Sequence, residues 1–143
     1  FGAKVIYYSA SGAPAQEGYE QVDFETLLTQ SDIISVHAPL NEHTEGLINS
    51  KAFKKMKSSC IFLNLGRGPI VDEQALYDAL VRNQIASAGL DVLCEEPMSA
   101  DNPLLKIKDS KRLLITPHIA WASVEARTHL MEIIHGQVKD FFA

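Results

Sequence analysis

Three side chains with complementary chemistry, Arg67, Glu96 and His118, each come shortly after a short apolar run. A guanidinium can bind a carboxylate through two parallel hydrogen bonds, and an imidazole can accept or donate a proton near neutral pH. If the apolar runs are neighbouring parallel strands, their carboxyl ends meet at one rim, where such sheets bind ligands. The sequence therefore predicts an acid/base site at that rim.

Each of these residues also has an ordinary structural interpretation. Arg67 lies between two glycines, so its side chain can project toward a ligand carboxylate or form a surface ion pair. Glu96, fixed before a proline, can hold the ring of His118 and stabilise its charged form, although the neighbouring Glu95 competes for that role. Of the four other histidines, we expect only His37 to line a cleft. None of the four has a setting comparable to that of His118, and the remaining three are His43, His129 and His135.

The apolar runs alternate with segments of helical periodicity, a pattern typical of a parallel sheet with both faces covered. We predict an α/β, doubly wound parallel sheet. Its strands are expected at Lys4–Tyr8, Ile33–His37, Cys60–Leu65, Ile85–Asp91 and Leu113–Thr116, with a weaker one at Gln21–Val22.

The segments between the strands predict the helices. Short helices are expected at Asp23–Gln30 and Ser50–Met56, and a crossover helix capped by Asp72 should run to about residue 82. A last helix from Ser123 to Phe142 carries an apolar stripe, and we expect this stripe to pack in the core. Its members are Leu130, Ile134, Val138 and Phe141. The loop from Cys94 to Lys111 is the only long irregular stretch, and loops of that length are often functional.

Composition narrows the class of protein. The chain has 143 residues, and 46% hydrophobic content is enough for one core. A net charge of −5 with scattered Lys and Arg argues against a nucleic-acid partner, and no apolar run is long enough for a membrane partner. Cys60 and Cys94 have no metal-ligand spacing, so we expect two reduced thiols, no metal site and a cytoplasmic location.

The motifs around the three side chains resemble those of the D-isomer-specific 2-hydroxyacid dehydrogenases, over nearly the whole chain. The matching segments are Asn64-x-x-Arg67-Gly68-x-x-Val71-Asp72-x-x-Ala75-Leu76, Leu90-Asp91-Val92 with Glu96-Pro97, and Thr116-Pro117-His118. Upstream, His37-x-Pro39-Leu40 and Thr44-x-Gly46-Leu47-Ile48 resemble the segment that passes the adenosine and ribose in that family. The resemblance implies a Rossmann-like sheet.

The resemblance also implies roles for individual residues. Arg67 would bind a small 2-oxoacid, His118 would protonate its carbonyl oxygen as a hydride arrives from the nicotinamide, and Glu96 would orient His118. Asp91 would meet the nicotinamide carboxamide. The implied cofactor-binding set is Ser9, His37, Ala38, Pro39, Leu65, Gly66, Arg67, Asp91, His118 and Ala120.

Three departures from the family pattern bear on these expectations. The glycine-rich phosphate loop and the first strand should precede Phe1, and the substrate domain is absent, so residues 1–143 are expected to be an excised, partial NAD(P)-binding domain. The loss of a central strand leaves unpaired edges, so we expect that the fragment either pairs them with a second copy, giving a homodimer, or is a proteolytic remnant of a longer protein. Ser9 stands where an acidic residue would bind the ribose 2′-hydroxyl, so the bias against a 2′-phosphate falls and NADP stays open. Because no Arg stands beside Ser9 to favour NADP, we expect NAD.

Trp121 resembles the glycerate and hydroxypyruvate branch of the family, or it simply packs against the last helix. The first interpretation makes hydroxypyruvate and D-glycerate the expected pair. Two other classes stay open: a corepressor-like protein that senses dinucleotide on the same fold, and an assembly module without activity of its own. We expect the isolated fragment to be inactive.

Overall fold

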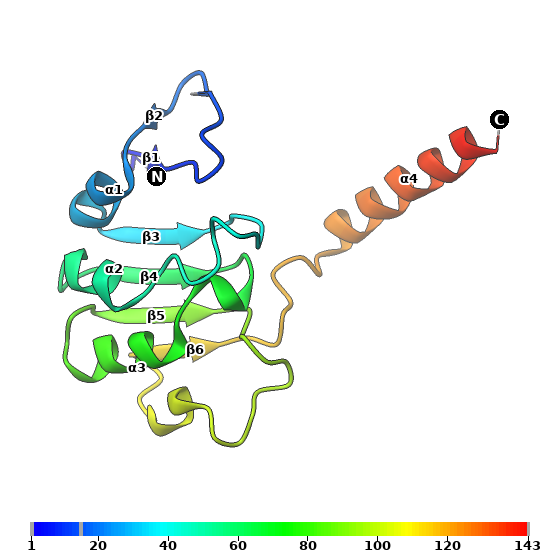
Figure 1. The fold of residues 1–143 in the computed structure, drawn as a ribbon. Coiled ribbons are helices and arrows are strands. Elements are labelled where there is room, and N and C mark those ends of the chain that lie inside the picture. Colours follow the sequence, from blue (N-terminus) through cyan, green and yellow to red (C-terminus); the bar gives the residue numbers. More distant parts are fainter. Residues whose placement is uncertain (1, 15, 143) are drawn as a thin grey trace.

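The computed structural model describes residues 2–14 and 16–142. Its centre is a four-stranded sheet in the order β3-β4-β5-β6, with every neighbouring pair parallel (Figure 1). The strands are β3 (Ile33–Val36), β4 (Ile61–Asn64), β5 (Ser87–Leu90) and β6 (Leu113–Ile115). Four of the predicted strands and the α/β parallel fold class are thereby confirmed, although each strand is shorter than its apolar run.

The N-terminal strands form a separate sheet. The strands β1 (Ile6–Tyr7) and β2 (Glu20–Gln21) pair in parallel only with each other. The weak sixth strand therefore exists, shifted by one residue, but the prediction that Lys4–Tyr8 joins the main sheet is wrong for the described residues. Only two residues of that run pair, and Val5 within it is 56% exposed, so the run lacks the cover that a central strand needs.

Three helices begin at side-chain caps that satisfy free backbone N–H groups. They are α1 (Phe24–Gln30), capped by Asp23; α2 (Ser50–Lys55), capped by Asn49; and α3 (Glu73–Val81), capped by Asp72. Two short 3-10 helices are also present, η1 (Gly68–Ile70) and η2 (Pro103–Lys106). The loop predicted as irregular from Cys94 to Lys111 contains η2.

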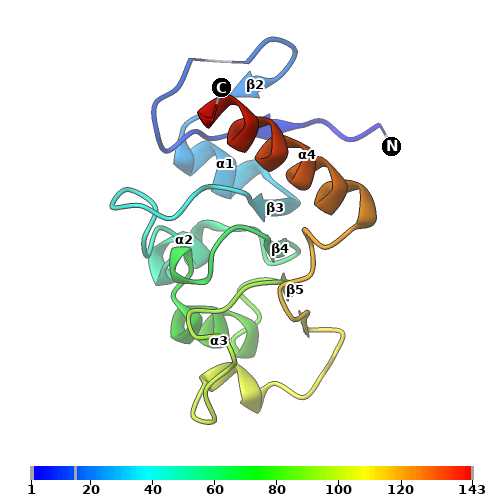
Figure 2. The same ribbon diagram turned by 90° about the vertical axis from the view of Figure 1, so that its right-hand side faces the viewer.

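The core lies between one face of the sheet and these helices. Side chains alternate along the strands, so Phe62 and Leu90 are buried with Leu76 of α3. The opposite face is open, because Ile33 and Leu114 are each 60% exposed. Among the described residues, helices therefore cover one face of the sheet (Figure 2), and the predicted second layer is not seen there.

Helix α4 (Val124–Phe141) contradicts the prediction that its apolar stripe packs in the core. Figures 1 and 2 show it extending away from the sheet beyond the carboxyl ends of the strands. None of its described residues is buried. The stripe members Leu130, Ile134, Val138 and Phe141 are 46%, 41%, 51% and 82% exposed. The periodicity correctly identified an amphipathic helix, but no described element covers its apolar side.

Candidate active site

The register of the parallel sheet brings the predicted chemistry to one rim. Val36 pairs with Asn64, Asn64 with Leu90 and Leu90 with Ile115, so the four strands end at nearly the same level. The segments that follow these strands carry the residues singled out in the sequence. The rim is therefore the carboxyl edge at which parallel α/β sheets bind ligands.

His118 and Glu96 are in direct contact at this rim. The His118 Nδ1 atom lies 2.8 Å from Glu96 Oε2, and the two side chains are 39% and 37% exposed. Because Nδ1 is engaged, Nε2 is the ring nitrogen left to meet a ligand. The structure thus selects Glu96 over Glu95 as the carboxylate that contacts the ring.

The Glu96 carboxylate is held on both of its oxygens. The backbone N–H of Leu93 donates to Oε1 at 2.9 Å, while the imidazole occupies Oε2. The backbone hydrogen bond from Leu93 and then the contact with His118 lower the pKa of Glu96 below its usual value. Glu96 therefore stays ionised at neutral pH and favours a proton on Nδ1 of the ring.

Asp91 organises the turn that carries His118. Its Oδ1 accepts from the Thr116 hydroxyl and from Ile119 N at 2.9 Å, and its Oδ2 accepts from Ala120 N at 2.8 Å. His118 adopts a left-handed backbone conformation with φ of 55°, which these bonds to the flanking residues hold in place.

Hydrogen bonding also sets the charge state of Asp91, which is 3% exposed. Burial alone would raise the pKa of Asp91, but the bonds from Thr116, Ala120 and Ile119 outweigh burial and lower the pKa. A carboxylate oxygen can accept two hydrogen bonds, so Oδ2 retains room for one more donor.

The turn that carries Arg67 is fixed by Asn64 at the end of β4. Asn64 is 1% exposed; its Oδ1 accepts from Gly66 N at 3.1 Å and its Nδ2 donates to the Arg67 carbonyl at 3.0 Å. The Arg67 side chain is exposed and donates to the Gly66 carbonyl at 2.9 Å. Among the described residues it forms no salt bridge, so the surface ion pair considered above is not observed there.

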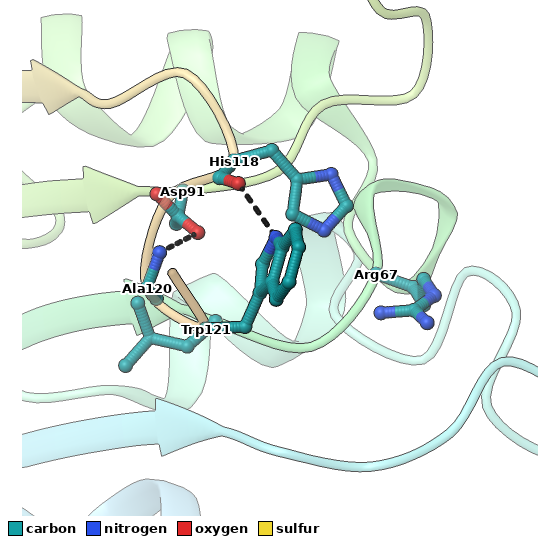
Figure 3. A pocket seen from close by; sticks show the side chains of 6 residues that line it. Arg67, Asp91, His118, Ala120 and Trp121 are labelled. Carbon is teal, nitrogen blue, oxygen red and sulfur yellow. Dashed lines mark hydrogen bonds between the residues drawn. The ribbon is translucent and has the colours of Figure 1, made fainter. Parts of the chain in front are cut away.

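Two adjoining cavities open at the rim. One of about 310 Å³ is lined by Leu65, Arg67, Asp91, His118, Ala120 and Trp121. The other, of about 450 Å³, is lined by His37, Ala38, Pro39, Leu40, Leu65, Gly66 and Arg67. Figure 3 shows the His118 ring on the side of the first cavity that faces Arg67, with Asp91 on the opposite side.

The two cavities adjoin along the rim. The two cavities share Leu65 and Arg67, so a ligand with two ring systems can occupy both. Gly66, which lines the second cavity, approaches the residues after β3 closely: a Cβ there would lie 3.0 Å from the Ala38 carbonyl oxygen. Nine of the ten residues predicted to bind the cofactor line one of the cavities. The tenth, Ser9, follows β1, lies 3.1 Å from Ser11 through their hydroxyls and lines neither cavity.

Several contacts that support the site were not predicted from the sequence. Asn64 and Thr116 were noted only as parts of motifs, and Trp121 was not expected to donate from Nε1 to the His118 carbonyl at 3.0 Å. A polar residue at the end of an otherwise apolar strand is the signal that could have revealed the contacts of Asn64. Trp121 itself is 53% exposed and lines the cavity.

The described residues contain no cluster of three or more potential metal ligands. Within the same residues, no helix is both long enough and apolar enough to span a membrane.

A parallel sheet with a carboxylate-paired histidine and two adjoining cavities at its carboxyl edge is the arrangement of a nucleotide-binding domain of the oxidoreductase type. Residues 1–120 match the family model for the NAD-binding domain of D-isomer specific 2-hydroxyacid dehydrogenases. The chain belongs to this family and is an NAD-binding domain of it, as the motifs predicted.

Relatives agree with this assignment. The chain is 45% identical over 142 residues to the hydroxypyruvate reductase of Blautia hydrogenotrophica, covering 98% of this chain and 43% of that protein. It is 45% identical over 122 residues to the glycerate dehydrogenase of Methylorubrum extorquens, covering 85% of this chain and 38% of that protein. The chain thus spans less than half the length of these relatives.

Solved structures share the fold. An acyclic imino acid reductase (Bsp5) in complex with NADPH and D-Arg matches with a TM-score of 0.86 and 37% identity, over 97% of this chain and 43% of that one. The D-lactate dehydrogenase from Aquifex aeolicus, complexed with NAD and lactic acid, matches with a TM-score of 0.85 and 29% identity. That match covers 99% of this chain and 46% of the other.

Proposed function

We propose that the full-length protein is a D-2-hydroxyacid dehydrogenase that interconverts a small 2-oxoacid and the D-2-hydroxyacid, with NAD as cofactor and NADP as the alternative. The observation that carries this proposal is the 2.8 Å contact between His118 Nδ1 and Glu96, beside a cavity that Arg67 also lines. Residues 1–143 would supply part of the NAD(P)-binding domain, and the rest of the protein would supply a substrate domain.

In this proposal His118 is the general acid and base. Glu96 holds Nδ1, so the opposite nitrogen, Nε2, can donate its proton to the carbonyl oxygen of a 2-oxoacid or accept it back from the hydroxyl. The ionised Glu96 stabilises the ring while it carries both protons. The cofactor, when bound, supplies or accepts the hydride at C2 of the substrate.

Arg67 is proposed to hold the substrate carboxylate. Its guanidinium is exposed at the cavity and has no salt-bridge partner among the described residues, so its planar fork is available for a bidentate contact. Its positive charge also offsets the negative charge that develops on the carbonyl oxygen during reduction.

Asp91 and the cavity walls are proposed to position the cofactor. The unfilled acceptor site on Asp91 Oδ2 suits an amide N–H donor such as the nicotinamide carboxamide. The second cavity, walled by residues 37–40, would take the adenosine side. Ser9 would face the ribose only if its loop moves toward the cleft. Because Ser9 has no carboxylate to repel a 2′-phosphate, NADP is kept as the alternative.

We propose hydroxypyruvate and D-glycerate as the substrate pair. Two of the relatives described above are named for these compounds, and Trp121, fixed by its bond to the His118 carbonyl, forms a wall of the substrate cavity. We also propose a cytoplasmic homodimer. The free thiols of Cys60 and Cys94 fit a reducing compartment. In the 143-residue chain by itself, β3 has an edge that no other described strand pairs, and a second copy could pair there.

The proposal is tested by assaying the full-length protein with NADH and NADPH against hydroxypyruvate, glyoxylate, pyruvate and phenylpyruvate. We expect turnover with hydroxypyruvate. His118→Gln should lower kcat by roughly 10²- to 10⁴-fold, the usual contribution of general acid/base catalysis. Arg67→Gln should raise KM for the 2-oxoacid and also lower kcat, since it removes both the carboxylate contact and the charge that offsets the developing negative charge on the carbonyl oxygen. His129→Gln, on exposed α4, is the matched control and should change neither.

Two results would contradict the proposal. Turnover in His118→Gln equal to that of the parent protein would remove the acid/base role. Tight NADH binding without turnover of any 2-oxoacid would instead indicate a dinucleotide-sensing protein.

A further inference from the structure

One carboxylate holds both ends of the loop that carries Glu96. This loop, residues 94–102, leaves the rim after β5 and returns to the core just before η2. Glu73 Oε1 accepts from the Cys94 backbone N–H at 2.8 Å, and Glu73 Oε2 accepts from Asn102 Nδ2 at 2.7 Å. Glu96 lies between these two attachment points in the chain.

Glu73 is itself rigidly placed. It is the first residue of α3, and the preceding cap residue Asp72 accepts from Ala75 N at 2.9 Å. The same helix is anchored by Leu76 and Ala79, which are both 0% exposed. A carboxylate in the first turn of a helix is also favoured by the helix dipole. Glu73 therefore connects the loop to one of the best-packed elements of the domain.

The start of the loop has a second attachment. A Cβ on Gly68 would lie 1.9 Å from the Leu93 carbonyl oxygen and 2.4 Å from Cys94 N, so only glycine permits this backbone contact. The Leu93–Cys94 peptide is thus bounded by Gly68 and bonded to Glu73. The N–H of Leu93 in turn donates to Glu96.

Between the attachment points the loop has few contacts: Glu96 binds Leu93 N and His118, and Ser99 bonds with Asp101 and Asn102. Residues 94–97 are exposed, and Met98 only packs partly against the core. The position of Glu96 therefore depends on its own two contacts and on how the loop ends are held.

On the basis of the proposed function, we propose that Glu73 is a positioning residue for the reaction: its carboxylate closes the 94–102 loop at both ends and so holds Glu96 against His118. Glu73 does not line either cavity, so it acts through the loop and not on the substrate.

The thiol of Cys94 reports on this closure without requiring catalysis. Its Sγ donates to the Val71 carbonyl at 3.6 Å. Although Cys94 as a whole is exposed, its Sγ is partly buried against Val71, and this burial and then the neighbouring Glu73 carboxylate raise the pKa of Cys94 to about 11. Because the thiolate is the reactive form, loss of the Glu73 charge or release of the loop should speed alkylation.

The experiment compares Glu73→Gln with the parent full-length protein. Glutamine keeps one acceptor oxygen, so one of the two loop contacts is lost. We expect kcat to fall roughly 10- to 100-fold, as for a catalytic group displaced by about 1 Å, with KM for the 2-oxoacid little changed. Alkylation of Cys94 by iodoacetamide at pH 8, followed by peptide mapping, should accelerate about tenfold, the change for one pKa unit. Glu95→Gln, which removes a charge from the same loop, is the control and should leave both quantities unchanged.

A double-variant cycle separates positioning from a general structural effect. If Glu73 acts through Glu96, adding Glu73→Gln to Glu96→Ala should lower kcat little further. Full multiplication of the two effects would overturn the proposal. Asn102→Asp breaks one of the two loop contacts without removing the Glu73 charge, and it also replaces Glu73→Gln if Glu73→Gln does not fold. This variant keeps the Oδ1 cap on Leu104 N, at 3.0 Å, but sets a second carboxylate against Glu73.

The outcomes distinguish this inference from the proposed function. Glu73→Gln speeds Cys94 alkylation through its lost charge alone, so the deciding variant is Asn102→Asp, which keeps the Glu73 charge. Faster alkylation in Asn102→Asp supports loop closure by Glu73, even in a protein that reduces no 2-oxoacid, a result that would reject only the proposed function. Unchanged alkylation and unchanged kcat in an active protein would overturn the role of Glu73 and leave the proposed function intact.

Discussion

Helix α3 buries its apolar side against the four-stranded sheet, whereas helix α4 buries none of its described side chains. Both helices begin at a side-chain cap, Asp72 in one and Ser123 in the other, and both are amphipathic. The difference is the partner: α3 returns the chain to the next parallel strand and must lie on the sheet, but α4 leads away from the last strand (Figure 1). An apolar stripe therefore identifies a side of a helix, and the connections decide whether that side is covered.

The largest effect expected from this comparison is on stability. Leu76 of α3 is 0% exposed and Leu130 of α4 is 46% exposed. Leu76→Ala should lower the free energy of unfolding of the 143-residue chain by about 3 kcal/mol, since it removes buried methyl groups and leaves a cavity. Leu130→Ala should change it by less than about 0.5 kcal/mol. Urea unfolding followed by circular dichroism measures both, and equal losses would break the distinction between the two helices.

The second prediction compares the stability effects of removing a buried carboxylate, Asp91, and an exposed one, Asp140 of α4. Asp91→Asn places an amide where backbone N–H groups donate, so it should cost about 1 to 3 kcal/mol at pH 7. Asp140→Asn, on exposed α4, should cost almost nothing.

The cost of Asp91→Asn should also depend on pH in a defined direction. The pKa of Asp91 is lowered below the ordinary value of 3.8, so ionised Asp91 stabilises the fold above about pH 4, and this contribution is lost as pH falls through the lowered pKa. The difference between parent and Asp91→Asn should therefore shrink between pH 5 and pH 2. A difference that stays constant over this range would show that the charge of Asp91 does not stabilise the turn.

Much of the fold could be predicted because its signals are local. Apolar runs marked β3 to β6, and Asp23 and Asp72 marked the starts of α1 and α3. The separation of β1 and β2 from the main sheet could not be predicted, since pairing depends on which strands lie beside them. The same holds for α4, whose exposure no property of its own sequence reveals.

The candidate site divides in the same way. Arg67, Glu96 and His118 could be selected by type and position, because parallel strands bring their carboxyl ends together. The contacts that support them could not. Glu73 reaches Cys94 and Asn102 across 21 and 29 positions of the chain, and such contacts leave no periodic or spacing signal.

The most direct test of the central claim is nitrogen NMR of His118 with and without Glu96→Ala, using His129 of α4 as the exposed reference. If Glu96 holds the ring through Nδ1, the neutral His118 ring should carry its proton on Nδ1, and Glu96→Ala should shift that proton toward Nε2, as in an unconstrained imidazole. A proton found on Nε2 in the parent protein and unaffected by Glu96→Ala would contradict the account.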